Sequence, residues 1–290
     1  MNEARAEPAP PSSGELCIPQ PPGGGQDGPV RAVTLDLWHT LVYLEPEAEE
    51  AYMRAQLDLA TDALASSPGP AGAAELGVEE LRAAFAAEYG AAVAAAQGGS
   101  SVTPAQQLER AAARTGREVD TPAYLKRLHE LVAATPFQKA PGALQMLAEL
   151  RELGLRTAVI SNTTGEPGAA LRPVLRRLGF DGLLETFVFS DERPWSKPAA
   201  EIFVDALSRL GADPSRAVHV GDGWVDIEGA RRAGFRGGIL YTGLQRYGEQ
   251  YRALFLPEGW TNPPAQYRVE RLEEIPRLAC RLLDGAAGGA

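Results

Sequence analysis

Apolar residues follow two different spacings along this chain, and the spacing changes near residues 44 and 135. Outside that segment, short apolar runs alternate with stretches of helical spacing. Short apolar runs between turn-forming residues are typical of buried strands. The predicted strands are 33–35, 156–160, 187–189, 217–220, 238–241 and 267–269. Because strands that alternate with helices form a parallel sheet covered on both faces, residues 30–43 and 136–284 predict one α/β, doubly wound domain.

The segment 44–135 is rich in Ala, Glu, Gln and Arg, and its apolar residues keep helical spacing throughout. Thr103-Pro104 has the pattern of an N-cap followed by proline at the first helical position, and Thr121-Pro122 repeats that start. Almost no β-branched run interrupts the pattern. The segment therefore predicts about four helices, which form a helical-bundle cap domain inserted into the α/β domain.

Three other segments lack the pattern of a packed core. Residues 1–29 hold seven prolines and a run of three glycines. Such a segment buries too little apolar surface to offset its ordering entropy, so a disordered leader is expected. The proline runs at 8–11 and 19–22 leave a partner-binding role open, because proline favours extended recognition segments. Residues 243–264 are expected to be an irregular connection, and 285–290 a flexible C-terminus.

Composition narrows the classes of protein. A net charge of -10 and the lack of a Lys/Arg-rich block disfavour nucleic-acid binding. The chain has no run of about 18 apolar residues, so no membrane span is expected. Only Cys17 and Cys280 are present, and they imply no disulfide framework. No apolar core of a signal peptide occurs near the N-terminus, so a cytoplasmic location is expected.

Polar groups suited to phosphate chemistry follow four of the predicted strands. Asp36 follows the first strand, and Ser161-Asn162 follows the second. Lys197-Pro198 follows the third, with the proline expected to begin a helix that Gly211 ends. Gly221-Asp222, with Asp226 one helical turn later, follows the fourth. Ligands of open α/β sheets bind at the carboxyl ends of the strands, so these groups are expected to lie at one site.

The order and residue types of these motifs resemble the haloacid dehalogenase superfamily of hydrolases. In that family an Asp nucleophile is followed by a variable residue, usually a second Asp, and Gly-Thr-Leu. The matching segments here are Asp36-Leu37-Trp38-His39-Thr40-Leu41, Ser161-Asn162, Lys197-Pro198 with Ile202-Phe203, and Gly221-Asp222 with Asp226. The resemblance covers residues 30–42 and 136–283, and it implies a Rossmann-like core with a helical cap between the first two motifs.

The resemblance implies a nucleophile and a metal site. Asp36 would attack phosphorus and form an aspartyl-phosphate. The carboxylates of Asp36 and Asp222 and the backbone carbonyl of Trp38 would hold Mg²⁺, a hard cation that prefers oxygen ligands. Asp226 belongs to the same metal site and would orient a metal-bound water or Lys197. The implied substrate is a small phosphorylated metabolite, whose identity the sequence leaves open, as it does the oligomeric state.

The remaining motif residues are implied to bind the phosphoryl group. Lys197 would neutralise charge on the nucleophile and on the substrate. The Ser161 hydroxyl and the backbone N–H groups of Asn162 and Trp38 would hold the phosphoryl oxygens. Thr40 would hydrogen-bond to the nucleophile and position it. Each residue also has an ordinary structural interpretation, such as a turn, a helix cap or a solvated lysine.

Trp38 departs from the family pattern, because most phosphatases of the family have an acid–base Asp there. An indole N–H only donates hydrogen bonds. Three interpretations stay open. The first is a phosphatase that either acts on good leaving groups without an acid or uses a substitute acid such as His39 or a cap residue. The others are a dehalogenase-type hydrolase acting at carbon and a catalytically weak scaffold. The dehalogenase branch lacks the Gly-Asp pair present at Gly221-Asp222, which favours the metal-dependent interpretation. The dehalogenase branch also has a cap arginine for the substrate carboxylate, but the position of Arg54 is not diagnostic of it. The phosphonate-cleaving branch has a Schiff-base lysine in the cap, and Lys126 lies too late in the segment to match it.

Two histidines have competing interpretations. His39 replaces the small residue usual beside the nucleophile, so it is a possible substitute acid for the leaving group, although solvent-facing packing is the simpler expectation. His219 lies inside a predicted strand and is expected to be a packed core residue.

Overall fold

The computed structural model describes residues 29–67, 69, 76–244 and 265–285. Nearly all of the leader 1–29, most of the connection 243–264 and all but the first residue of 285–290 lie outside this part of the chain. Cys17 lies outside it too, so the expectations for these segments and for a disulfide stay predictions.

A six-stranded sheet forms the centre of the α/β domain, and its strands follow the order β5-β4-β1-β6-β7-β8. Every neighbouring pair in this sheet is parallel. The strands are β1 Ala32–Leu35, β4 Arg156–Ser161, β5 Thr186–Phe189, β6 Ala217–Gly221, β7 Gly237–Tyr241 and β8 Tyr267–Val269. The predicted doubly wound α/β fold is confirmed, and the observed strands differ from the predicted ones by one residue at most at either end.

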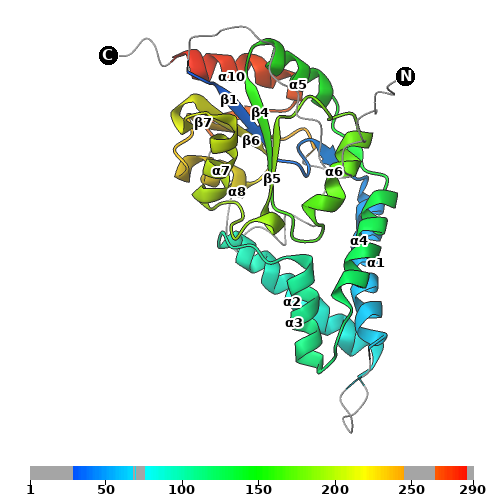
Figure 1. The fold of residues 1–290 in the computed structure, drawn as a ribbon. Coiled ribbons are helices and arrows are strands. Elements are labelled where there is room, and N and C mark those ends of the chain that lie inside the picture. The colour runs from blue at the N-terminus through cyan, green and yellow to red at the C-terminus, as the bar shows by residue number, and fades with distance from the viewer. Residues whose placement is uncertain (1–28, 68, 70–75, 245–264, 286–290) are drawn as a thin grey trace, which may run out of the picture.

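Helices cover both faces of the sheet (Figure 1). They are α5 Ala143–Glu152, α6 Gly168–Arg177, α7 Ala200–Leu210, α8 Trp224–Arg232 and α10 Ile275–Asp284. Alternate residues of β1 enter two different cores: Val33 and Leu35 pack with α5, α6 and α10, whereas Ala32 packs with α7 and α8. Burial on both faces explains why the central strands are largely apolar and do not alternate between apolar and polar residues.

The strand register brings the carboxyl ends of the three central strands together. Leu35, the last residue of β1, pairs with Val159 of β4 and with Val220 of β6. The backbone N–H of Asp36 then donates to the carbonyl of Val220 at 2.8 Å. The side chains that follow these strands therefore share one edge of the sheet, the edge where open α/β sheets bind ligands.

Four helices occupy the segment that was predicted to be helical. They are α1 Pro46–Ala65, α2 Val78–Gln97, α3 Pro104–Thr115 and α4 Thr121–Ala134. The chain leaves the sheet domain through β2 Val42–Tyr43 and returns to it through β3 Gln138–Lys139, and these two strands pair as a short antiparallel ribbon. Figure 1 shows the four helices together, below the sheet domain in that view.

Two predicted helix starts are wrong by one or two residues. Thr103 caps α3 as predicted and accepts from the backbone N–H of Gln106 at 3.2 Å. In α4, however, the cap is Asp120, which accepts from the backbone N–H of Ala123 at 2.9 Å, so Thr121 is already helical. Helix α7 begins at Ala200 and not at Pro198, because the preceding residues form a turn in which the backbone N–H of Ala199 donates to the carbonyl of Ser196 at 2.9 Å. No helix of the described residues is long and apolar enough to cross a bilayer.

Candidate active site

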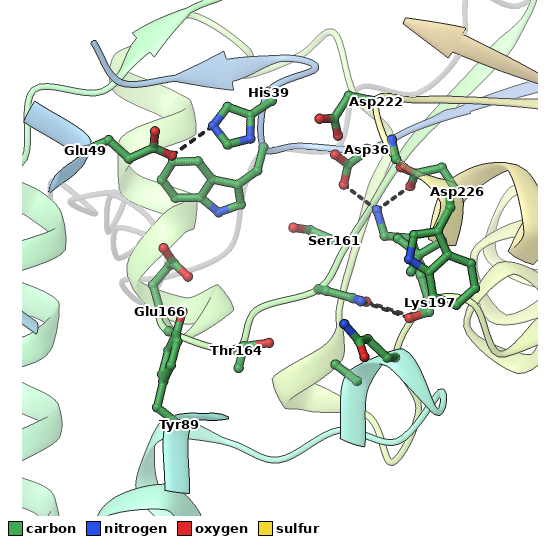
Figure 2. A pocket seen from close by; sticks show the side chains of 18 residues that line it. Asp36, His39, Glu49, Tyr89, Ser161, Thr164, Glu166, Lys197, Asp222 and Asp226 are labelled. Carbon is green, nitrogen blue, oxygen red and sulfur yellow. Dashed lines mark hydrogen bonds and ion pairs between the residues drawn. The ribbon is translucent and has the colours of Figure 1, made fainter. Parts of the chain in front are cut away.

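The four strand-end motifs meet at one cavity of about 160 Å³. Asp36, Ser161, Lys197, Asp222 and Asp226 all line it, as Figure 2 shows. An empty cavity of ~150 Å³ holds a molecule the size of benzene, so this volume suits a small organic compound. The structure thus brings together all four predicted motifs from distant parts of the chain.

Lys197 is the centre of a buried ionic cluster. Its ammonium donates to the Asp36 carboxylate and, at 2.6 Å, to the Asp226 carboxylate. The three side chains are nearly inaccessible, with exposed fractions of 5% for Asp36, 2% for Lys197 and 1% for Asp226. Burial opposes the charged form of Lys197, but the two carboxylates raise its pKa above the ordinary value. The lysine is therefore a fixed positive charge beside Asp36.

Asp36, Asp222 and Asp226 together form the ligand set that a hard cation needs. One carboxylate oxygen of each lies within 4.8 Å of the others. Three carboxylates face one ammonium, so negative charge is in excess. Burial raises the pKa of the Asp36 carboxyl to about 7, against the attraction of Lys197. A divalent cation would offset the excess charge and favour the ionised form of Asp36, so the donor set fits Mg²⁺.

The second motif supplies a hydroxyl, from Ser161, and an amide side chain, from Asn162, that holds the backbone of Lys197. Ser161 is 1% exposed, and its Oγ has no hydrogen-bond partner among the described residues. A buried polar atom of this kind calls for a ligand or a water, and Ser161 lines the cavity. The Asn162 side chain donates to the carbonyl of Lys197 at 3.0 Å and accepts from its backbone N–H at 2.7 Å. Asn162 therefore also fixes the Lys197 loop, a role the sequence did not suggest.

Two further residues hold the carboxylates of this cluster. The Thr40 hydroxyl donates to Asp36 Oδ2 at 3.4 Å, which agrees with its predicted position. His219 is fully buried, as expected of a core residue, but it also bonds to Thr34 Oγ1 at 2.8 Å and to Asp226 Oδ1 at 3.1 Å. Burial lowers the pKa of His219, so a neutral ring with Nε2–H donating to Asp226 fits both contacts.

Trp38 belongs to an aromatic cluster that joins the loop after β1 to helix α1 of the inserted segment. Its ring lies 5.3 Å from the ring of Phe137, edge to face, and 6.5 Å from that of Tyr52 on α1. Such pairs contribute to packing beyond their buried area. The side chain that replaces the usual acid is thus part of the wall of the cavity.

The expectation that His39 faces solvent is wrong. His39 is 8% exposed, and its Nε2 lies 2.9 Å from Glu49 Oε1, at the start of α1. Its backbone has φ of 54°, in the left-handed region that favours glycine. This backbone conformation explains why a small residue is usual at this position, and the Glu49 carboxylate accounts for the burial of the imidazole.

Residues outside the motifs complete the cavity. Glu49, Tyr89 and Glu166 are among the lining residues, and none of them was a predicted site residue. Their positions depend on how the inserted helices pack against the sheet domain. A pattern within a single sequence carries no signal of that packing.

Comparison with known proteins identifies the family of this chain. Residues 30–234 match the family model of haloacid dehalogenase-like hydrolases. The chain therefore belongs to this family of hydrolases, as the motifs indicated. The role of each site residue stays a prediction.

Two curated relatives show how far the similarity extends. The chain is 31% identical over 184 residues to N-acetylmuramic acid 6-phosphate phosphatase of Pseudomonas aeruginosa, which covers 60% of this chain and 73% of the relative. It is 41% identical over 153 residues to phosphonoacetaldehyde hydrolase of Bordetella avium, covering 48% of this chain and 54% of the relative. The chain thus spans only about half the length of the second relative.

A solved structure supports the fold. The crystal structure of a HAD phosphatase from Thermococcus onnurineus is similar with a TM-score of 0.56 and 20% sequence identity. The match covers 86% of this chain and 97% of that chain. At this identity the similarity shows the shared fold alone.

Proposed function

We propose that this protein is a Mg²⁺-dependent phosphatase that hydrolyses a small phosphorylated metabolite through an aspartyl-phosphate on Asp36. The observation that carries the proposal is the carboxylate cluster of Asp36, Asp222 and Asp226 beside Lys197. We also propose residues 44–135 as the cap and residues 30–43 and 136–284 as the core.

Asp36 is the proposed nucleophile. One of its carboxylate oxygens forms a bond to phosphorus while the bond from phosphorus to the leaving-group oxygen breaks, and the leaving group takes up a proton. Water then attacks the aspartyl-phosphate, which releases phosphate and restores the Asp36 carboxylate. Two displacements replace a single difficult one.

Charge compensation is the main task of the surrounding residues. Asp36 and Asp222, with the backbone carbonyl of Trp38, would hold Mg²⁺, which when bound supplies positive charge against the repulsion between carboxylate and phosphate. Lys197 adds a second positive charge at Asp36. Asp226 keeps the Lys197 ammonium in place from the other side.

Phosphoryl oxygens need hydrogen-bond donors. The Ser161 hydroxyl, which has no partner in the part of the chain that the structure describes, is one donor, and the backbone N–H groups of Asn162 and Trp38 are proposed as two more. Thr40 orients the nucleophile. For leaving-group protonation, His39 is the proposed substitute acid, because Trp38 has no acidic proton to give.

A dehalogenase-type reaction at carbon is the second candidate, because an aromatic residue occupies the position of Trp38. The presence of Asp222 in the carboxylate cluster favours the phosphatase over it. Purified protein with para-nitrophenyl phosphate separates the two. We expect hydrolysis that requires Mg²⁺ and stops with chelator. Halide release from 2-haloacids in the presence of chelator, without phosphate release, would establish the second candidate instead, and activity on neither substrate would favour a scaffold.

A further inference from the structure

The cavity has a second polar wall that the proposed chemistry does not use. In Figure 2, Glu49 and Glu166 lie on one side of the cavity and Asp222, Asp226 and Lys197 on the other. Glu49 comes from α1, and Glu166 comes from the loop between β4 and α6. A substrate with its phosphate at Asp36 therefore directs its leaving group toward this second wall.

Glu166 is a buried carboxylate without a cationic partner in the described part of the chain. It is 7% exposed, its own backbone and that of Gly165 hydrogen-bond to it, and the Tyr52 hydroxyl donates to Oε1 at 3.5 Å. Burial raises the pKa of its carboxyl to about 7. A buried carboxylate is costly unless it is paired, so this group gains from a ligand that donates to it.

Glu49 adds an unpaired acceptor. It is 1% exposed and lines the cavity. Its Oε1 bonds to His39, but its Oε2 has no hydrogen-bond partner among the described residues. Buried polar atoms of folded proteins nearly always have a partner, so Oε2 indicates a donor that a bound molecule brings.

The loop that carries Glu166 is held in place by the inserted helices. Gln56 of α1 donates to the carbonyl of Gly165 at 3.1 Å, and Gln107 of α3 donates to the carbonyl of Thr164 at 2.7 Å. Both bonds fix the backbone directly before Glu166. The loop that presents the Glu166 carboxylate to the cavity is therefore anchored on two of the inserted helices, as a specificity site requires.

Charge on the lining residues limits what the leaving group can carry. Lys197 is the one lysine or arginine among the described lining residues, and Asp36 and Asp226 already hold its ammonium. A carboxylate on the leaving group would face Glu49 and Glu166, and His39, the other described lining residue that can carry a positive charge, already bonds to Glu49. Like charges in a site of low polarity cost several kcal/mol, on the order of a thousandfold in affinity.

We propose that the leaving group carries hydroxyl or ammonium groups that donate to Glu166 and Glu49, and that phosphate esters with a carboxylate on the leaving group are poor substrates. This proposal rests on the phosphatase function. It assigns Glu166 as a specificity-determining residue, a position that none of the four motifs contains.

A matched series of alkyl phosphates of two to four carbons tests it, with ammonium, hydroxyl, methyl or carboxylate at the far end. For the wild-type protein with Mg²⁺ we expect kcat/KM for the ammonium and hydroxyl esters to exceed that for the carboxylate ester by roughly tenfold or more. The ammonium and hydroxyl arms show which donor the site prefers. Equal or better hydrolysis of the carboxylate ester would overturn the proposal. Failure to hydrolyse para-nitrophenyl phosphate would instead concern the phosphatase function itself.

Variants of Glu166 assign the preference to this residue. Glu166→Gln should reduce the ratio of ammonium to carboxylate hydrolysis by roughly tenfold, while Glu166→Asp, which keeps the charge, should retain the preference. Glu201→Gln, an exposed glutamate on α7, is the matched control and should leave the ratio unchanged. A ratio that stays at the wild-type value in Glu166→Gln would overturn the assignment. If that variant does not fold, Glu49→Gln tests the same wall, and an unchanged ratio there would overturn the proposal too.

Discussion

Lys197 and Glu166 are both buried charged residues of one cavity, but their surroundings differ. The Lys197 ammonium lies between two carboxylates, whereas Glu166 has a tyrosine hydroxyl and backbone groups around it. The first wall, which consists of Asp36, Lys197, Asp222 and Asp226, has its ion pairs formed before any substrate binds. The second wall holds carboxylates whose pairing depends on what enters the cavity. Under the proposed function, chemistry and specificity are separated in space, with the phosphate at the first wall and the leaving group at the second.

The largest effect should come from the nucleophile on the first wall. Asp36→Asn keeps the shape of the side chain but removes its nucleophilic charge, so turnover should fall by roughly 10⁴-fold or more. Steady-state hydrolysis of para-nitrophenyl phosphate with Mg²⁺ measures the loss. Asp181→Asn changes an exposed residue outside the cavity and serves as the control. Comparable activity of the two variants would contradict the role of Asp36.

A second test of the first wall concerns the metal. Asp222→Ala deletes a charged ligand, so it should abolish Mg²⁺ binding and lower Mg²⁺-dependent activity by roughly 10²–10⁴-fold. Titration calorimetry with Mg²⁺ gives a readout apart from activity. If Asp222→Ala stayed fully active with chelator present, the metal-dependent interpretation would be wrong.

The lack of an acidic residue at Trp38 should divide substrates by their leaving groups. General acid catalysis contributes roughly 10²–10⁴-fold, so an aryl phosphate should be cleaved far faster than an alkyl phosphate. His39→Ala should depress alkyl-ester cleavage further and leave the aryl ester nearly unchanged. Trp38→Asp should narrow the gap, provided that the carboxylate does not disturb Asp36.

The outcomes of this comparison are distinct. Equal rates for both ester classes in the wild type, together with no effect of His39→Ala, would mean that another group supplies the proton. Measuring kcat/KM for para-nitrophenyl phosphate and for ethyl phosphate is sufficient.

The smallest expected effect is on the free energy of unfolding, which the buried carboxylate of Glu166 should lower at neutral pH. Burial raises the pKa of Glu166 from 4.5 to about 7. The folded state therefore binds the proton more tightly than the unfolded state, and its stability falls as pH rises from about 4.5 to 7. Glu166→Gln removes this loss. The variant should gain up to about 3 kcal/mol relative to wild type between pH 4.5 and pH 8.

Urea unfolding of both proteins at the two pH values measures that difference, and Glu201→Gln controls for the general pH dependence. If the difference in unfolding free energy between Glu166→Gln and wild type does not change with pH, burial does not raise the pKa of Glu166.

The first wall could be predicted from the sequence, and the second could not. Asp36, Ser161, Lys197 and Asp222 each lie at or after the carboxyl end of a strand, and parallel strands bring these ends to one edge, so local patterns are sufficient to place them together. Glu166 is a charged residue in a loop. Its burial follows from contacts of Tyr52 and Gln56, more than a hundred residues earlier in the chain.

His39 could be singled out from the sequence, but its burial could not be predicted. Its position next to the nucleophile is a local fact, and the sequence singled it out on that basis. Its burial against Glu49 requires α1 to pack over the nucleophile loop. His39 lies only three residues after Asp36 and was nevertheless expected to face solvent, since no pattern along the chain records which helix covers it.

The central claim is that Asp36 itself receives the phosphoryl group. Acid quenching of the wild-type protein during turnover of para-nitrophenyl phosphate with Mg²⁺, followed by mass spectrometry of the peptide that contains Asp36, tests this directly. We expect a phosphorylated Asp36 peptide that appears with Mg²⁺ and is absent both with chelator and in Asp36→Asn. Phosphate release at the wild-type rate with no label on Asp36, or a label on a different residue, would contradict the account.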